Sequence, residues 1–519
     1  MNPETAFTER PSPIDESLAE MLVRRAGMTG GDAELAKAAI TRLSARRGEG
    51  HSALPLDDEP KGAEWKRALH GGGLAGPSED RCPLVLRDGL LQFRRYADAE
   101  DRIAARLRQR VSATPPRLRI ITGGPGSGKT TRVAGDIVAR VTADPGIRIT
   151  LAAPTGKAAA RLTESIGARL VELKASAEVR RRIPADARTL HRLLGYQPWD
   201  DSFRSGPQRP LGEDLIIVDE ASMIDVLMMD ALLQGIREDA ELVLVGDHRQ
   251  LASVETGDVL GSIVRSPALR PVVTELTGNH RFASQPGIAA VAEAIRAERI
   301  DEAVDLLLRS AHEDARCRPL PFTESGLIVL IEARLLACIN AATPREMLDA
   351  LDEVRILCAE REGRLGVAGI NAIVERWAAS RGLSTRDRWY HGRPVLVGAN
   401  DYAAEVFNGD LGVCWRREDG RVEVHLPTPD GGTRTLSPDR LPAGTTAWAM
   451  TVHKSQGSEF SEVVLVLPQQ ESRLLTRELI YTGLTRARRR VTVLGAEAVL
   501  RAGLTATAAR QSGLTTRLS

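Results

Sequence analysis

The chain has 519 residues, enough for roughly three or four domains that each bury a core. Its 70 basic and 69 acidic side chains give a net charge of +1, which excludes a polycation that binds nucleic acid through overall charge. No segment approaches the ~18 uninterrupted apolar residues of a membrane span, and the N-terminus lacks a signal peptide. We therefore expect a cytoplasmic protein without membrane contact, in which any DNA contact comes from a local groove.

The cysteines and lysines further limit the kinds of chemical site that we expect in this chain. The five cysteines lie far apart and form no C-x-x-C pair, so neither a disulfide framework nor a zinc or iron–sulfur site is indicated. Only seven of the 70 basic residues are lysines, and three of these, Lys129, Lys157 and Lys454, lie in the motifs described below. In such an arginine-rich chain, these lysines indicate sites that need a compact ammonium rather than a planar fork.

The first 95 residues contain no catalytic pattern. Helical periodicity covers residues 14–25 and 32–46, and loop-rich stretches follow at 51–61 and 71–77. We predict a helical N-terminal docking domain over residues 1–95. Residues 90–104 are predicted to form the helix that leads into the next domain.

A phosphate-binding loop lies at residues 120–131, which read I-I-T-G-G-P-G-S-G-K-T-T. It satisfies G-x-x-x-x-G-K-[ST], between a buried strand predicted at 118–121 and a helix predicted at 131–141. Glycines let successive N–H groups approach a phosphate at a helix N-terminus. Lys129 would reach the β- and γ-phosphates, and the Thr130 hydroxyl would hold Mg²⁺. The predicted ATP contacts are Gly123, Gly124, Gly126, Ser127, Gly128, Lys129, Thr130 and Thr131.

A second transition from strand to helix follows at A-P-T-G-K-A-A-A-R-L, residues 153–162. Pro154, Thr155 and Lys157 stand at the helix start, where N–H groups suit a phosphodiester backbone, although an ordinary N-capped helix has the same pattern. His191, in T-L-H-R-L-L-G, is by itself more typical of a structural histidine than of a catalyst. Residues 196–212 are rich in proline and glycine and predict a small inserted hairpin.

Paired carboxylates follow a buried strand predicted at residues 215–218. Such a strand places Asp219 at the C-terminal edge of a parallel sheet beside the phosphate loop, where it can hold the water shell of Mg²⁺. Glu220 is then positioned to orient and deprotonate the attacking water. The next strand, 242–245, leads to Gln250, which could sense the γ-phosphate. Arg281 is a candidate γ-phosphate contact across a domain cleft.

The second half of the chain begins a new α/β unit. Residues 354–359 are strand-like, and short strands with turn signals recur from residue 388 to residue 441. That spacing predicts a small β-barrel or meander inserted in the unit.

The order of these motifs resembles superfamily 1 helicases, and their wording is similar to the RecD branch, the α subunits of RecBCD-type exonuclease V complexes. The resemblance spans residues 90–495 and rests on G-G-P-G-S-G-K-T-T, A-P-T-G-K-A-A-A-R-L, T-L-H-R-L-L-G, V-D-E-A-S-M and G-D-H-R-Q-L-A-S-V-E-T-G. It implies an α/β fold with two RecA-like P-loop NTPase motor domains, at residues 96–282 and 283–510, and a tail at 511–519. In this family the 388–441 insertion is an SH3-like module that grips single-stranded DNA.

The resemblance also assigns roles to residues. W-A-M-T-V-H-K-S-Q-G-S-E-F, residues 448–460, resembles helicase motif V, which implies that Thr451 and His453 touch the DNA backbone and that Glu459 reaches the ribose. Y-T-G-L-T-R-A-R resembles motif VI, with Arg486 as the arginine finger that neutralises charge on the γ-phosphoryl oxygens. The expected catalytic set is Lys129, Asp219, Glu220, Gln250, Arg281 and Arg486, and the expected DNA contacts are Pro154, Thr155, Lys157, His191, Thr451 and His453.

The function implied by the resemblance is ATP- and Mg²⁺-dependent translocation along single-stranded DNA from 5′ to 3′. The implied partners are RecB- and RecC-type subunits, in a heterotrimer that unwinds duplex DNA ends for recombinational repair. No metal-dependent nuclease signature is apparent, so the cutting centre is expected in another subunit.

Two alternatives remain open. One is a stand-alone RecD-like or relaxase-type DNA helicase, or an RNA-directed relative. The short N-terminal region weighs against a stand-alone RecD-like helicase, and the lack of nicking-type histidine clusters weighs against a relaxase. The other is a regulatory subunit that binds ATP and never translocates. Glu220, Gln250 and Arg486 argue against the second, because a subunit without turnover has no need of them.

Overall fold

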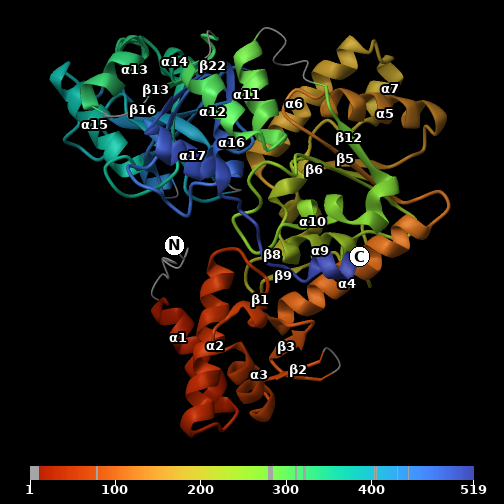
Figure 1. Cartoon of the computed structure of the whole chain (residues 1–519). Helices are drawn as coiled ribbons and strands as arrows, with labels where there is room; N and C mark the ends of the chain where they lie inside the picture. Colours follow the sequence, from red (N-terminus) through yellow and green to blue (C-terminus); the bar gives the residue numbers. More distant parts are fainter. Residues whose placement is uncertain are drawn as a thin grey trace.

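A computed structural model of the chain describes residues 11–77, 80–278, 285–309, 312–318, 323–401, 404, 406–428, 431–441 and 443–519. An N-terminal module, residues 11–93, lies below two α/β domains that stand side by side (Figure 1). We name these the first α/β domain, residues 94–276, and the second α/β domain, residues 286–505. Within the described ranges, no helix is both long and apolar enough to span a membrane.

The N-terminal module combines helices with a small sheet of strand order β1-β4-β3-β2. Its elements are α1 (Pro13–Arg25), α2 (Gly30–Gly48), β1 (Leu54–Pro55), α3 (Gly62–Gly71), β2 (Ala75–Gly76), β3 (Leu84–Arg87) and β4 (Leu90–Phe93). The prediction of a helical domain is therefore wrong in part, because the module contains this four-stranded sheet as well as its helices. The helix predicted to begin at residue 90 begins instead at Arg94, because Asp88 and Gly89 (φ 52° and 75°) form the two-residue turn of a β3–β4 hairpin.

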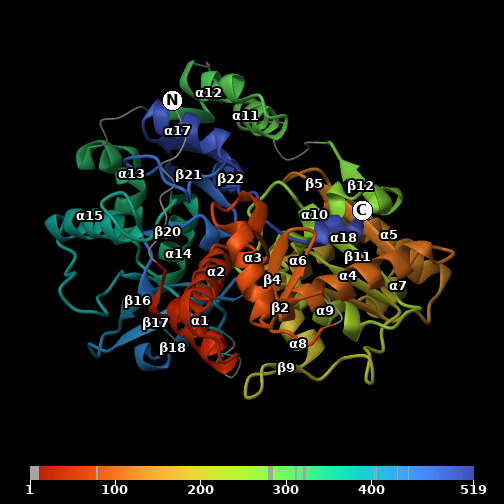
Figure 2. The same cartoon turned by 60° about the horizontal axis from the view of Figure 1, so that its bottom comes forward.

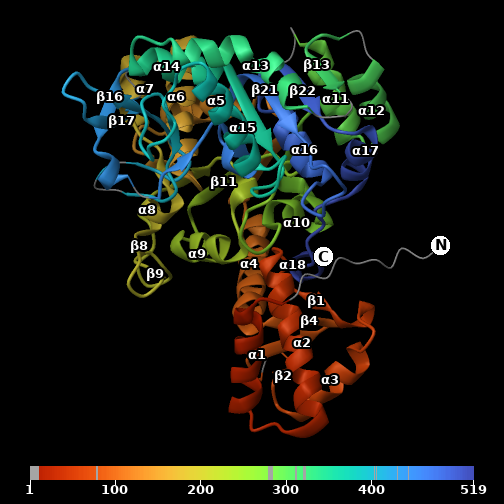
Figure 3. The ribbon, with the colours of Figure 1, turned by 90° about the vertical axis from the view of Figure 1, so that its left-hand side faces the viewer.

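The first α/β domain is built on a parallel sheet of strand order β12-β5-β11-β10-β6-β7. Its central strands are buried almost throughout, because helices cover both faces. The β8–β9 hairpin projects from this domain within the predicted 196–212 insertion (Figure 3). The elements are α4 (Arg94–Ser112), β5 (Leu118–Gly123), α5 (Lys129–Ala143), β6 (Ile149–Ala153), α6 (Gly156–Glu172), α7 (Ala177–Arg182), β7 (Arg188–Thr189), α8 (Leu190–Leu194), β8 (Tyr196–Gln197), β9 (Ser202–Phe203), β10 (Leu215–Val218), α9 (Val226–Gly235), β11 (Glu241–Gly246), α10 (Val259–Arg265) and β12 (Val273–Leu276).

The second α/β domain repeats this plan with a parallel sheet of strand order β13-β22-β21-β14-β20. Two parallel sheets in one chain, each lined by helices, agree with the prediction of two RecA-like domains. The elements are α11 (Pro286–Arg296), α12 (Ile300–Arg309), β13 (Ala315–Arg318), α13 (Glu324–Ile339), α14 (Pro344–Glu353), β14 (Val354–Cys358), α15 (Val367–Ser380), β20 (Ala449–Thr451), β21 (Phe460–Val466), α16 (Arg477–Leu484), β22 (Ala487–Leu494) and α17 (Glu497–Thr505).

An antiparallel sheet is inserted between α15 and β20, with strand order β18-β17-β16-β15-β19. Its strands are β15 (Pro394–Leu396), β16 (Leu411–Arg416), β17 (Val422–Pro427), β18 (Thr433–Leu436) and β19 (Thr445–Thr446). The sheet encloses a core of its own around Val395, Val424 and Leu426, and it packs against α14 (Figure 2). A β meander therefore stands where sequence predicted one, and its likeness to an SH3 module stays a prediction.

The C-terminal residues return to the first α/β domain. Helix α18 (Leu514–Leu518) packs against α4 and α10, and Leu514 and Leu518 are buried in that domain's core. The Arg510 guanidinium donates to the Gly257 carbonyl (2.9 Å) and to two further carbonyls of the same loop. The segment 511–519, predicted to be a tail, is thus a docked part of the fold.

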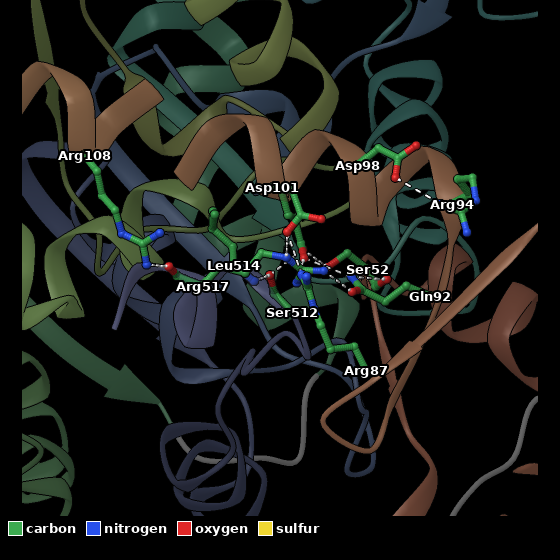
Figure 4. A network of polar contacts seen from close by, with 11 residues as sticks. Ser52, Arg87, Gln92, Arg94, Asp98, Asp101, Arg108, Ser512, Leu514 and Arg517 are labelled. Atoms are coloured by element: carbon green, nitrogen blue, oxygen red, sulfur yellow. Dashed lines mark hydrogen bonds and ion pairs between the residues drawn. The ribbon is translucent and has the colours of Figure 1, made fainter. Parts of the chain in front are cut away.

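Arg517 anchors this segment through a buried polar network (Figure 4). Its Nη1 lies 2.7 Å from Glu100 Oε2, its Nε lies 2.6 Å from Asp101 Oδ1, and its Nη2 donates to Gln92 Oε1 (2.9 Å). The Ser52 hydroxyl donates to the other Glu100 oxygen (2.6 Å). The network joins the N-terminal module, α4 and the C-terminal segment at one point.

We expect Arg517→Gln to destabilise this junction by about 3 to 5 kcal/mol, because it leaves the fully buried Glu100 carboxylate without a cation. Native-state hydrogen exchange in α4 and α18 measures the loss. Arg95→Gln is the matched control: it removes an ion pair with Asp201 whose side chains are both 64% exposed, so its effect should stay below about 1 kcal/mol. Equal exchange in the two variants would contradict this account.

Candidate nucleotide site between the two α/β domains

The phosphate loop occupies the C-terminal end of β5, and α5 begins at Lys129. Gly126 and Gly128 adopt φ values of +77° and +87°, which side chains disfavour. A Cβ atom at Gly123 would lie 2.6 Å from the Leu276 carbonyl oxygen. The loop therefore needs glycine at these three positions, and it leads directly into the N-terminus of α5, where N–H groups favour an anion.

Polar atoms of the loop fit a phosphate ligand. The Lys129 ammonium donates to the carbonyls of Gly123 (2.5 Å) and Gly124 (2.9 Å), which holds it over the loop. The Ser127 hydroxyl is buried and finds no hydrogen-bond partner among the described residues. A buried hydroxyl of this kind needs an external partner, and phosphate oxygens at the loop would supply one.

Asp219 and Glu220 follow β10 at the same edge of the sheet. Glu220 has left-handed backbone angles (φ 52°, ψ 39°), which are rare for a residue with a side chain. Burial, followed by the negative charge of Glu220, raises the pKa of Asp219 to about 6. A strained backbone beside a desolvated carboxylate is typical of a functional site rather than of a solvated strand end.

A cleft of about 1000 Å³ brings most of the predicted site together. Its lining includes Gly126, Ser127, Gly128, Lys129, Thr130, Thr131, Asp219, Glu220, Gln250, Glu459 and Arg486. Gly123 and Gly124 belong to the phosphate loop behind this lining. Arg281 lies outside the described residues.

The donor set in the cleft fits Mg²⁺. Thr130 and Asp219 both line it and offer a hydroxyl and a carboxylate oxygen. Mg²⁺ prefers oxygen ligands and takes few of them from the protein when phosphates and water supply the others.

Arg486 enters the site from the second α/β domain. Its Nη2 donates to Gln250 Oε1 (2.8 Å), and its other nitrogens donate to the carbonyls of Ser458 (3.3 Å) and Thr482 (3.2 Å). Burial lowers the pKa of Arg486, and the charges of Glu220 and Asp247 oppose that shift. The guanidinium therefore lies within electrostatic reach of one acidic residue that follows β10 and another that follows β11.

Further hydrogen bonds join the two domains around this arginine. Asp247 Oδ2 accepts from Gln250 Nε2 (3.2 Å) and from the Tyr481 hydroxyl (3.0 Å). The Leu251 N–H donates to Thr482 Oγ1 (2.9 Å). A change at a γ-phosphate next to Gln250 would thus reach α16 of the other domain through direct contacts.

Glu459 has a partner that the sequence did not indicate. Its carboxylate forms an ion pair with Arg161 of α6, so a residue of the second α/β domain is tied to the first. Arg161 Nη1 also lies 3.4 Å from the Gly457 carbonyl oxygen. Arg161 lines the cleft and was part of a recognised motif, but no role was predicted for it.

The candidate DNA contacts at residues 154–157 form the start of α6. The Thr155 hydroxyl accepts from the Ala158 N–H (3.2 Å), so the ordinary helix cap is present. Such a cap leaves the remaining N–H groups at the helix start available. Burial lowers the pKa of Lys157, and Asp352 and Asp410 of the second half of the chain oppose that shift.

The other candidate DNA contacts occupy two places. Thr451 ends β20, and its Oγ1 accepts from the Lys454 N–H (3.3 Å); His453 follows directly. His191 instead packs edge-on against Tyr196 at 5.2 Å between ring centroids. That contact fits a structural histidine under the hairpin, and the DNA roles of all these residues stay predictions.

Sequence comparisons place the chain among known helicases. Residues 105–312 match the family described as AAA domain, and residues 446–494 match the UvrD-like helicase C-terminal domain. The chain is 38% identical to the RecBCD enzyme subunit RecD of Mycolicibacterium smegmatis, over 99% of this chain and 98% of that protein. It is 32% identical to the ATP-dependent RecD2 DNA helicase of Deinococcus radiodurans, over 86% of this chain and 55% of that protein.

Structure comparison finds Bacteroides Pif1 bound to single-stranded DNA, with a TM-score of 0.40 and 19% identity. The match covers 75% of this chain and 91% of that one.

Proposed function

The chain belongs to the RecD family of superfamily 1 helicases, and from this premise we propose how it couples ATP hydrolysis to movement along DNA. It is an ATP-dependent DNA helicase that acts as a subunit of a RecBCD-type enzyme. The observation that carries the coupling is the Arg486–Gln250 hydrogen bond across the cleft, at 2.8 Å. It links the residues expected around the γ-phosphate to both α/β domains.

The residues of the cleft divide the hydrolytic work. Lys129 leaves the loop carbonyls to neutralise the β- and γ-phosphates, and Glu220 accepts a proton from the attacking water. Arg486 neutralises charge that grows on the γ-phosphoryl oxygens. Mg²⁺, held by Thr130 and Asp219, would add charge neutralisation on the same phosphates. Loss of the γ-phosphate removes the anion between Lys129 and Arg486, which favours opening of the cleft.

We assign the DNA path to the surface that joins the start of α6, the end of β20 and the inserted sheet. Lys454 Nζ donates to Asn408 Oδ1 of the insertion at 2.5 Å, so two of these parts are already in contact. Thr155, Lys157, Thr451 and His453 would hold phosphates, and the inserted sheet would act as the SH3-like grip. Alternate grip by the two domains then moves the chain along one strand.

The finer assignments come from family membership. We propose 5′-to-3′ polarity, assembly with RecB- and RecC-type subunits at duplex DNA ends, and a nuclease centre in a partner. A stand-alone helicase is the runner-up, but the chain matches 55% of the length of the RecD2 DNA helicase, against 98% for the RecBCD enzyme subunit RecD of Mycolicibacterium smegmatis. The other alternative, a regulatory subunit that binds ATP and never translocates, conflicts with the assignment of the chain as a DNA helicase.

ATP turnover by the purified chain, with and without oligo-thymidine and with partner subunits supplied, tests the proposal. We expect DNA-stimulated turnover in the wild type, and unwinding only of forks that offer a 5′ single strand. Lys129→Gln controls for contaminating ATPase and should abolish both. Absence of DNA-stimulated turnover, even in the reconstituted complex, would refute the motor, and unwinding only from 3′ strands would refute the polarity.

A further inference from the structure

Arg161 connects two surfaces that the proposed function needs to couple. It lies on α6 one helical turn after Lys157, so both side chains belong to one rigid element. The start of that helix faces the proposed DNA path, and Arg161 lines the nucleotide cleft. Any shift of the helix start on binding DNA therefore moves Arg161 within the cleft.

The partners of Arg161 lie on the other α/β domain. Its guanidinium pairs with Glu459 and approaches the Gly457 carbonyl oxygen at 3.4 Å. The backbone of Gly457 is close to α6 as well, because a Cβ atom there would lie 3.6 Å from Ala158 Cβ. Arg161 thus ties the segment 457–459 to α6.

The surrounding charges make this position sensitive to nucleotide. Glu220 and Asp219 attract the Arg161 guanidinium, whereas Arg486 repels it. Phosphates in the cleft would add negative charge between these cations. The position of Arg161 therefore depends on nucleotide at one end of α6 and on DNA at the other.

A purely structural role would not account for the position of the Arg161–Glu459 ion pair. The side chains of Arg161 and Glu459 are 34% and 21% exposed, and ion pairs that remain in contact with solvent contribute about 1 kcal/mol or less to stability. A pair this weak adds little to the fold, yet it spans the cleft whose closure sets turnover.

We propose that Arg161 is a positioning residue that transmits DNA binding from the start of α6 to Glu459, and so makes closure of the nucleotide cleft depend on DNA. The inference rests on the proposed function and names its coupling element. It requires a thermodynamic coupling between ATP and DNA that passes through the Arg161–Glu459 pair.

The test measures that coupling in the full chain with its partner subunits. Affinity for oligo-thymidine is determined with and without a non-hydrolysable ATP analogue, and affinity for that analogue is determined with and without the same strand, because reciprocal coupling holds for binding free energies. In the wild type we expect each ligand to tighten the other about 5- to 150-fold. In Arg161→Gln both factors should fall to about one, whereas Arg161→Lys should keep part of the coupling because it keeps the charge.

Two further variants sharpen the result. Glu459→Gln should lose the coupling to the same extent, and the double variant should be no worse than either single one, because both remove the same contact. Arg148→Gln, which breaks the exposed Arg148–Asp214 pair on the same domain, should behave as wild type. Unchanged coupling in Arg161→Gln would overturn this inference alone. Absence of DNA-dependent turnover in the wild type would overturn the proposed function and the inference with it.

Discussion

Arg486→Lys should reduce ATP turnover by about three to five orders of magnitude, the range that an arginine finger contributes to phosphoryl transfer. Arg486 is buried, and its planar fork donates to Gln250, Ser458 and Thr482 at once. A lysine keeps the charge but cannot direct donors to all three positions and to a γ-phosphate. Single-turnover hydrolysis with saturating ATP and DNA measures the chemical step directly.

The control for this variant is Arg490→Lys on β22, the strand that follows Arg486. Arg490 is exposed and lies 3.8 Å from Glu462, so its replacement should leave turnover within about twofold of wild type. Nucleotide affinity should change little in either variant, since Lys129 and the phosphate loop remain. A loss smaller than tenfold in Arg486→Lys would show that this arginine does not act on the γ-phosphate.

Glu220→Gln should lower turnover by about 10² to 10⁴, the usual contribution of a general base. The glutamine has nearly the same shape but cannot accept a proton from the attacking water. The left-handed backbone at Glu220 is compatible with both residues to a similar degree, so the fold should persist. Nucleotide binding should also persist, and the variant should accumulate as a complex with unhydrolysed ATP.

Glu238→Gln provides the matched comparison, because Glu238 is an exposed carboxylate of the same domain, away from the cleft. It should hydrolyse ATP at the wild-type rate. If Glu220→Gln retained more than about a tenth of wild-type turnover, another group would have to take the proton. Asp219 would then be the first candidate, because its raised pKa makes it a better proton acceptor than an ordinary aspartate.

Most of the features that could be predicted from the sequence depend on local motifs. The phosphate loop and the Asp219–Glu220 pair each consist of consecutive residues. Both follow parallel strands, whose C-terminal ends lie at the same edge of the sheet. The two parallel sheets follow from the same alternation of buried strands and helices. These features need no knowledge of contacts between distant segments.

The features that the sequence did not predict are of two kinds. Some are contacts between segments far apart in the chain, and others are elements too short to show a hydrophobic period. Arg161 meets Gly457 from 296 positions away, and nothing in either local pattern specifies the other. Helix α18 spans five residues, fewer than two turns, so its buried leucines give no helical periodicity. The β3–β4 hairpin did have a local signal in Asp88 and Gly89, but the helical pattern downstream outweighed it.

The return of the C-terminal segment gives the two α/β domains a second covalent connection. The chain passes from the first α/β domain to the second after β12, and residues 506–512 connect the two domains again, between α17 and the site where α18 docks (Figure 1). A body attached at two points turns most readily about the line through both, whereas an arbitrary twist strains at least one attachment. We therefore expect the cleft to open and close about one fixed axis. With each ATP, the start of α6 and the end of β20 would then move relative to each other along the same arc.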